Sequence, residues 1–264
     1  MAAAAITLLV VLNAILLVLY LRLRQRSHRV KSAARGQKNG WGKIPLRAIY
    51  DLFPQFERST LGPLATTEVR HVANDHTPGG VSDYESWILC NIVKRAESVF
   101  EFGTATGKTS YLLGANSPTK AIIHTITLAP AEHASYLHTA KDAQSDLANA
   151  IEESVFEHFV YSGTPVESKI EQLFADSKAF SFSAYHGRMD LVFIDGSHAR
   201  SYVESDSQNA LAMLRPGGCI VWHDYRGPDV TPGVFEVINA LADDLALAHI
   251  KGTCMVVYQK PLDG

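Results

Sequence analysis

The residues best placed to do chemistry surround a glycine-containing turn in the middle of the chain. The segment Val99–Ser110 reads VFEFGTATGKTS, an apolar β-prone run that breaks into glycines and threonines and then restarts as a helix. Gly103 and Gly107 would let the backbone approach a ligand closely, and N–H groups of the first helical turn would point at that ligand. In an open α/β sheet, ligands bind beyond the carboxyl ends of the strands. The turn is therefore the predicted centre of a ligand site.

The same turn partly matches a phosphate-binding loop. Gly103–Thr109 reads GTATGKT, and Leu191–Asp195 is an apolar run ending in an acid that could hold Mg²⁺. The motif G-x-x-x-x-G-K-[ST] requires one more residue, and a cradle of backbone N–H groups depends on the length of its loop. A P-loop-like nucleotide-binding protein is therefore kept only as a lesser alternative.

Alternating strands and helices are predicted to position the turn. Beside the strand that precedes the turn, the expected strands are Ala121–Leu128, Phe156–Tyr161, Met189–Asp195, Cys219–His223, Leu247–Ile250 and Cys254–Tyr258. The expected helices are Leu46–Phe56, Ser82–Ile92, Ala131–Ser154, Val166–Phe174, Tyr202–Leu214 and Val234–Leu245. Repeated β-α units imply a parallel sheet with right-handed crossovers.

The N-terminal segment predicts membrane attachment. Ala2–Leu21 has no charged residue and is about as long as the ~20 residues of a spanning helix. A cleaved signal peptide is the alternative, but the basic residues follow the apolar run instead of preceding it. We therefore expect an anchor at 1–23, a basic linker at 24–45 and one domain at 46–264. The positive-inside rule places that domain in the cytoplasm.

Composition narrows the function classes. The net charge is −3 and the pI is near 6.4, which argues against a general nucleic-acid binder, since such proteins are normally basic. Cys90, Cys219 and Cys254 have no paired spacing, so they predict neither a disulfide framework nor a zinc site.

Four stretches, taken together and in order, resemble the class I S-adenosylmethionine-dependent methyltransferases, nearest to the small-molecule O-methyltransferase branch. They are Val81–Glu85, Val99–Ser110, Asp190–His198 and Leu214–Tyr225. The resemblance spans about residues 81–260. It implies an α/β, Rossmann-like, seven-stranded, mostly parallel sheet with helices on both faces. The last strand would be antiparallel and would form a C-terminal β-hairpin.

The resemblance also assigns residues to the cofactor. Thr127 and Leu128 fall where relatives place an acid for the ribose hydroxyls, and Gly163–Pro165 falls where relatives often place an acid near the adenine. Both positions lack a carboxylate here. The full set expected to bind S-adenosylmethionine is Glu101, Gly103, Thr104, Gly107, Thr127, Leu128 and Asp195.

Two acids define a candidate metal site. Asp195 and Asp224 end the fourth and fifth strands, which are neighbours in the resembled fold, so their carboxylates could share Mg²⁺. Metal-dependent relatives carry an amide where this chain has Tyr225. His198 or His223 could supply a ligand or a general base. The alternative is that both acids only hydrogen-bond their loops. His198 and Asp224 are the expected catalytic residues.

The predicted function is O-methylation of a small-molecule acceptor by a membrane-anchored enzyme that uses S-adenosylmethionine, with Mg²⁺ assistance as an option. The alternative is a catalytically inactive binding or scaffold subunit of a membrane assembly, since two cofactor acids are missing. The anchor could also pair with a membrane protein, and no nucleic-acid partner is expected. Lys108 and Glu152–Glu153 are expected to face solvent.

Overall fold

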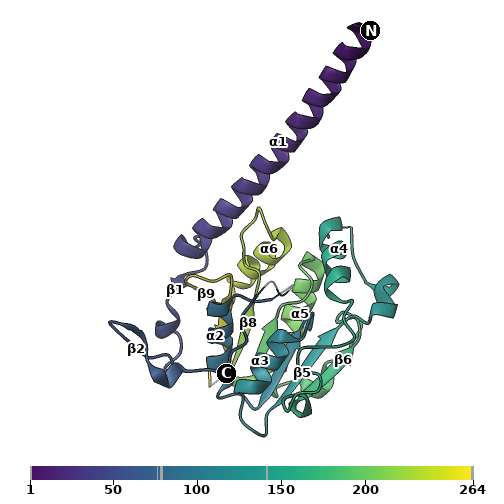
Figure 1. Cartoon of the computed structure of the whole chain (residues 1–264). Coiled ribbons are helices and arrows are strands. Elements are labelled where there is room, and N and C mark those ends of the chain that lie inside the picture. The colour runs from purple at the N-terminus through teal and green to yellow at the C-terminus, as the bar shows by residue number, and fades with distance from the viewer. Residues whose placement is uncertain (1, 76, 78–79, 141, 263–264) are drawn as a thin grey trace.

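The computed structural model describes residues 2–75, 77, 80–140 and 142–262 and consists of an α/β domain with a long helix projecting from it (Figure 1). The α-helices are α1 (Ala2–Asn39), α2 (Asp83–Val93), α3 (Lys108–Asn116), α4 (Gln144–Glu153), α5 (Arg200–Met213) and α6 (Pro232–Leu241). Short 3-10 helices are η1 (Ile49–Asp51), η2 (Ala65–Thr67), η3 (Pro130–Ser135), η4 (Glu167–Lys169) and η5 (Ser183–Tyr185).

The central sheet has the strand order β1-β9-β10-β8-β7-β4-β5-β6. Its strands are β1 (Leu46–Arg47), β4 (Ser98–Phe102), β5 (Ile122–Thr127), β6 (Ile170–Phe174), β7 (Met189–Ile194), β8 (Leu214–Trp222), β9 (Ala248–Ile250) and β10 (Val256–Gln259). A separate two-stranded hairpin joins β2 (Arg58–Ser59) to β3 (Gly62–Pro63). All pairings in the central sheet are parallel except those of β10 with β8 and β9. The predicted Rossmann-like fold with an antiparallel terminal strand is confirmed, and β1 adds an eighth strand.

Helices cover both faces of this sheet because its central strands are apolar on both sides. On β7, Leu191 and Phe193 join an apolar cluster with α2, whereas Val192 and Ile194 join a second cluster with α5 and α6. Successive side chains of a strand point to opposite faces, so a continuous apolar run is buried on both. The two clusters hold the β4–α3 turn and the end of β7 in fixed positions.

Helix α2 begins with a capping box formed by Ser82 and Glu85. The Ser82 hydroxyl accepts the backbone N–H of Glu85 at 3.3 Å, and the Glu85 carboxylate accepts the N–H of Ser82 at 3.0 Å. This arrangement satisfies N–H groups that have no partner within the helix. It also fixes the Glu85 side chain below the candidate site.

The third strand of the β-α series lies later in the chain than predicted. The segment 156–161 contains no strand, and β6 occupies residues that were expected to be helical. Val166, Ile170, Leu173 and Phe174 recur at helical spacing, but β6 is an edge strand whose partial burial gives no clear alternation. The residues that follow β6, and not Gly163–Pro165, therefore lie at the carboxyl end of the sheet.

Three other elements differ from expectation. Residues 46–56 form only β1 and η1 instead of an amphipathic helix, and residues 131–154 form η3 and α4 instead of one helix. Helix α1 continues to Asn39, so most of the basic segment expected as a linker is helical. Among the described residues, α1 is the helix long and apolar enough to cross a membrane, and its apolar part is not buried by the domain.

Candidate functional site

The β4–α3 turn requires glycine because of its backbone shape and its surroundings. Gly103 has a φ of +92°, and a Cβ atom there would lie 2.2 Å from the carbonyl oxygen of Asp195. Gly107 has a φ of +75° and caps the N-terminus of α3, with the aromatic rings of Phe159 and Tyr161 against it. A positive φ is energetically unfavourable for residues other than glycine, and no Cβ fits at Gly103. The turn is consequently pressed against the end of β7.

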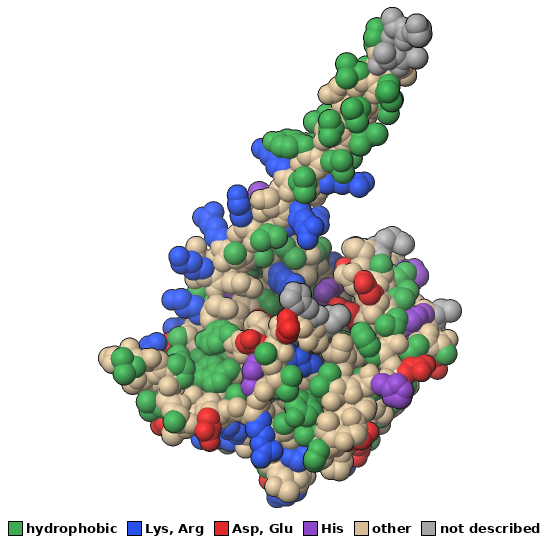
Figure 2. All heavy atoms as spheres, in the orientation of Figure 1, with side chains coloured by type: hydrophobic (Ala, Val, Ile, Leu, Met, Phe, Trp, Pro, Cys, Tyr) green, Lys and Arg blue, Asp and Glu red, His purple; other side chains and the backbone are tan. Residues whose placement is uncertain are grey.

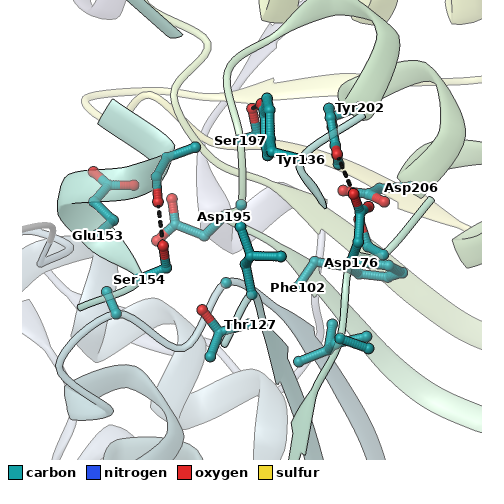
Figure 3. Close-up of a pocket in the computed structure, with 18 residues that line it drawn as sticks. Phe102, Thr127, Tyr136, Glu153, Ser154, Asp176, Asp195, Ser197, Tyr202 and Asp206 are labelled. Carbon is teal, nitrogen blue, oxygen red and sulfur yellow. Dashed lines mark hydrogen bonds between the residues drawn. The ribbon is translucent and has the colours of Figure 1, made fainter. Parts of the chain in front are cut away.

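A cleft opens beyond the carboxyl ends of β4, β5, β6 and β7 (Figure 3). We call it the strand-end cleft, and its volume is about 580 Å³ including its open mouth. Its lining includes Gly103, Thr127, Leu128, Asp176 and Asp195.

A second hollow, the polar cavity, adjoins this cleft and has a volume of about 990 Å³ including open space. It is lined by charged and polar groups, among them Lys108, His198, His223, Asp224 and Arg226. Gly103, Ala105, Glu153 and Asp195 line both hollows. A ligand in the strand-end cleft would therefore meet a second ligand in the polar cavity at the β4–α3 turn.

Asp195 and Asp224 converge as the neighbouring strands predicted, with histidines bound to both. His223 Nδ1 lies 2.8 Å from Asp195 Oδ1 and 3.3 Å from Asp224 Oδ2. His198 Nε2 lies 2.7 Å from Asp224 Oδ2, and an Arg226 nitrogen lies 2.7 Å from Asp224 Oδ1. His223 thus bridges the two acids, whereas His198 and Arg226 contact Asp224 alone.

These contacts fix the charges in the cluster. Burial opposes ionisation of Asp224, but His223 and His198 outweigh it and hold the pKa of Asp224 well below its usual range. Burial lowers the pKa of His223, yet Asp195 and Asp224 raise it well above its ordinary value. The pKa of His198 is raised to about 9, because Asp224 overcomes the cost of burial. At neutral pH the cluster holds carboxylates paired with imidazolium ions.

These residues do not fit a Mg²⁺ ion. Mg²⁺ prefers oxygen ligands in octahedral geometry, whereas an imidazole nitrogen bridges the two carboxylates here. Arg226 already offsets the charge of the remaining Asp224 oxygen. Tyr225, at the position of the expected amide, is buried and accepts a hydrogen bond from Asn239, so it offers no ligand to the cavity. The predicted Mg²⁺ site is not supported.

A further acid and a thiol hold His223 from its other side. His223 Nε2 lies 3.5 Å from Glu85 Oε2 and 3.2 Å from Cys254 Sγ. Hydrogen bonds and the charge of His223 overcome burial and lower the pKa of Glu85. The backbone N–H of Cys254 also donates to Glu85 at 2.8 Å. Cys90, Cys219 and Cys254 are free and buried.

The predicted residues of the glycine turn lie in different settings. Thr104 lines the polar cavity, but its hydroxyl bonds the Thr125 hydroxyl at 2.8 Å and accepts from Gln172 at 3.1 Å. Glu101 is fully buried and accepts a hydrogen bond from the Ser110 hydroxyl. Its other carboxylate oxygen has no hydrogen-bond partner in the described part of the chain. Burial raises the pKa of Glu101 to about 8. Glu101 thus supports the turn from beneath and does not line either hollow.

Asp176 is an acid of the strand-end cleft that the sequence reasoning missed. It follows β6, and its carboxylate accepts a hydrogen bond from the Tyr202 hydroxyl at 2.6 Å (Figure 3). The carboxylate also accepts the backbone N–H of Lys178 at 2.8 Å. Thr127 and Leu128 line the same cleft, whereas Gly163–Pro165 do not. The segment Ala175–Ser177 follows an apolar run and could have indicated this acid. It was missed because residues 166–174 were predicted to be a helix and not a strand. Asp176 therefore follows the third strand of the β-α series, where the sequence analysis found no acid because it placed Gly163–Pro165 there.

Two residues expected to face solvent line the site instead. Glu153 lies on the wall shared by both hollows, and burial raises its pKa to about 7. Lys108 is 2% exposed, and its ammonium has no hydrogen-bond partner among the described residues. Burial also lowers the pKa of Lys108. The expectation of a solvated face fails because α4 and the start of α3 form walls of the polar cavity.

Comparison with known proteins points in one direction. A family model described as a methyltransferase domain matches residues 100–225, which contain the glycine turn, Asp195 and Asp224. A search of curated proteins found no match.

Similar solved structures include three bacterial proteins. The O-methyltransferase TomG from Streptomyces achromogenes is 16% identical, with a TM-score of 0.48 over 69% of this chain and 82% of that chain. The cofactor-bound protein Rv0187 from MTB is 17% identical, with a TM-score of 0.49 over 75% and 85%. An O-methyltransferase from Bacillus cereus is 15% identical, with a TM-score of 0.46 over 69% and 82%. The predicted resemblance to methyltransferases is confirmed by the match of residues 100–225 to a methyltransferase-domain model.

Proposed function

We propose that this protein is a membrane-anchored O-methyltransferase that uses S-adenosylmethionine. The observation that carries the proposal is the meeting of two hollows at Gly103 and Asp195. Methyl transfer requires a donor and an acceptor aligned at a short distance, and adjoining sites provide that alignment. The strand-end cleft would hold the donor and the polar cavity the acceptor.

The strand-end cleft suits the parts of S-adenosylmethionine. Gly103 lets the turn pack against the end of β7 and lines the cleft, where the methionine part would lie. Thr127 offers one hydroxyl toward the ribose. Asp176 ends the neighbouring strand, and its carboxylate keeps acceptor capacity for the adenine amine beyond the bonds it already accepts. When bound, the cofactor supplies an activated methyl group on a sulfonium sulfur.

His198 is the proposed base in the polar cavity. Its Nε2 is bound to Asp224, which leaves Nδ1 for the acceptor hydroxyl. Asp224 raises the pKa of His198 to about 9, so the imidazole must first release its proton to water, and the fraction that can act as a base increases as the pH approaches 9. The neutral imidazole of His198 would take the proton of the acceptor hydroxyl, and bound S-adenosylmethionine would supply the methyl group to that oxygen. The products are a methyl ether or ester, S-adenosylhomocysteine and a proton that later leaves to water.

Helix α1 is proposed to anchor the domain in a membrane. Residues 6–21 are apolar and exposed, and arginines follow them directly. By the positive-inside rule the domain at 46–264 would lie in the cytoplasm. Protease added outside intact cells should leave this domain uncut, and its digestion there would overturn the orientation.

Photo-crosslinking with radiolabelled S-adenosylmethionine tests the cofactor binding on which the proposed activity depends. The purified full-length protein should be labelled, and S-adenosylhomocysteine should block the labelling whereas ATP should not. Competition by ATP alone would favour the phosphate-binding alternative. Absence of any labelling would favour the inactive scaffold, for which the missing ribose acid at Thr127 is the supporting observation.

A further inference from the structure

Helix α1 is fastened to the part of the domain that carries the site. The Ser32 hydroxyl donates to Asp229 at 3.1 Å, and the Gly252 N–H donates to the carbonyl of Gln37 at 3.0 Å. Trp41, just after the helix, lies against Gly227 and packs edge-on against Phe235 of α6 with ring centroids 5.9 Å apart. These contacts hold the base of α1 against the loop that follows Asp224.

A third hollow, which we call the outer hollow, lies between α1 and the domain. It has a volume of about 920 Å³ including open space. Gln25, His28 and Arg29 of α1 form one side of it, and Asp146 of α4 and residues 228–232 form the other. The loops concerned follow β5 and β8, so the outer hollow lies at the carboxyl ends of the strands, as the polar cavity does.

The outer hollow and the polar cavity share their walls. On α4, Asp146 lines the outer hollow, whereas Asn149 and Glu153 line the polar cavity. These positions are three and seven residues apart and lie on one face of the helix. In the opposite wall, Asp224 and Arg226 line the polar cavity and residues 228–232 line the outer hollow. Continuous elements thus lead from α1 to the candidate catalytic residues.

The outer hollow lies close to the end of the apolar part of α1. Gln25 and Arg29 are four and eight residues beyond Leu21, which corresponds to about 6 and 12 Å along the helix axis. The headgroup layer of a bilayer extends roughly 5–8 Å beyond the hydrocarbon. The helix has no break between the apolar part and Asn39, so the domain cannot move far from the bilayer. In Figure 1, α4 and α6 lie on the side of the domain from which α1 rises.

The charges at the outer hollow match this position. Arginines at 22, 24, 26 and 29 follow the apolar run, and Figure 2 shows basic side chains along α1 between its apolar part and the domain. Basic residues at this depth bind anionic headgroups. They would hold the mouth of the outer hollow against the lipid surface.

We propose that the methyl acceptor is a membrane-resident amphiphile, which enters from the bilayer through the outer hollow. Its apolar tail stays in the lipid while its hydroxyl-bearing head reaches His198 and Asp224 in the polar cavity. This substrate class rests on the proposed methyltransferase function. Because the outer hollow would open toward the membrane, the acceptor would not have to leave the bilayer and cross water to reach the polar cavity.

Fluorescence quenching tests the orientation without any knowledge of the acceptor. Two variants of the full chain would each carry a fluorescent reporter on one added cysteine. Val230→Cys lies beside the outer hollow, and Thr119→Cys lies at the opposite end of the sheet. The native cysteines are buried. In phosphatidylcholine vesicles with a headgroup nitroxide lipid, the reporter at 230 should be quenched strongly and the reporter at 119 weakly. Equal quenching, or stronger quenching at 119, would overturn the proposal.

Transfer of the radiolabelled methyl group from S-adenosylmethionine to an extract tests the substrate class. Full-length protein in membranes would receive radiolabelled S-adenosylmethionine together with either a lipid extract or a water-soluble extract of the source cells. The label should enter a lipid-soluble product. Insertion of one alanine heptad after Arg24, which moves the domain about 10 Å from the bilayer, should lower this labelling several-fold and leave S-adenosylhomocysteine binding unchanged.

The two proposals fail in different ways. Label found only in water-soluble products, or no transfer by a protein that still binds S-adenosylhomocysteine, would overturn the membrane acceptor. Loss of cofactor binding by the unmodified protein would overturn the methyltransferase function, and the acceptor proposal with it.

Discussion

His223 Nδ1 lies 2.8 Å from Asp195 Oδ1, in the space between two carboxylates where a divalent cation would otherwise sit. Because Asp224 also lies 3.3 Å from the same nitrogen, one imidazolium offsets the repulsion between both acids. The charge balance of the site therefore comes from side chains of the chain itself.

This balance predicts that Mg²⁺ does not stabilise the protein. A ligand that binds only the folded state raises its free energy of unfolding, so absence of binding leaves the melting temperature unchanged. The measurement is thermal unfolding in detergent with and without millimolar Mg²⁺. A rise in the melting temperature of the wild type that is smaller in Asp224→Asn would restore the shared metal site.

Asp224→Asn should destabilise the fold. Asn tolerates the backbone φ of +57° at this position, so the change tests charge and not backbone strain. It leaves His198, His223 and Arg226 without their common counter-ion, and breaking a buried pair costs about 3–5 kcal/mol. The free energy of unfolding, measured with urea in detergent, should fall by that order. Asp229→Asn, on an exposed loop, is the matched control and should change it by less than about 1 kcal/mol. An equal effect of the two changes would contradict the charge cluster.

His198→Gln should separate catalysis from cofactor binding. The imidazole lines the polar cavity and not the strand-end cleft, so its loss should leave the affinity for S-adenosylhomocysteine unchanged. Loss of a positioned base lowers rates by roughly 10²–10⁴-fold. Label transfer to the membrane extract and cofactor binding are the two readouts. Wild-type transfer by the variant would remove His198 from the mechanism.

The Glu101 carboxyl predicts a pH-dependent stability. Its folded-state pKa is about 8, above the ~4.3 of an unfolded chain, so the folded protein holds a proton that the unfolded chain has lost. This stabilisation is present at low pH and is lost as the pH rises from about 5 through 8. Glu101→Gln cannot ionise, so its stability relative to wild type should increase over that range. A difference that stays constant from about pH 5 to pH 9 would show that Glu101 is ionised when folded.

Much of the fold could be predicted from the sequence because its signals are local. The apolar runs of β4, β7 and β8 are long enough to mark buried strands, and the glycines after β4 mark the turn. Order along the chain then places Asp195 and Asp224 side by side, and the structure brings them to one cluster. The edge strand β6 was not predicted, because it is only partly buried. Asp176, which follows β6, was therefore missed as well.

The electrostatics of the site could not be predicted, because they depend on contacts distant in sequence. Glu85 and Cys254 meet His223 although they are 169 residues apart, and no local pattern indicates that meeting. Lys108 and Glu153 looked like surface residues, since the sequence does not show that their helices form cavity walls. Side-chain environment, unlike strand order, follows from the tertiary packing.

The most direct test of the methyltransferase function is calorimetric binding of S-adenosylhomocysteine to the full-length wild type, Gly103→Ala and Gly163→Ala. Both glycines have positive φ, but only at Gly103 does an added Cβ meet backbone, at 2.2 Å from the Asp195 carbonyl oxygen. The wild type and Gly163→Ala should bind with the same affinity, and Gly103→Ala should lose at least ten-fold. Absence of binding to the wild type at millimolar ligand, or equal binding by all three proteins, would contradict cofactor binding at the β4–α3 turn.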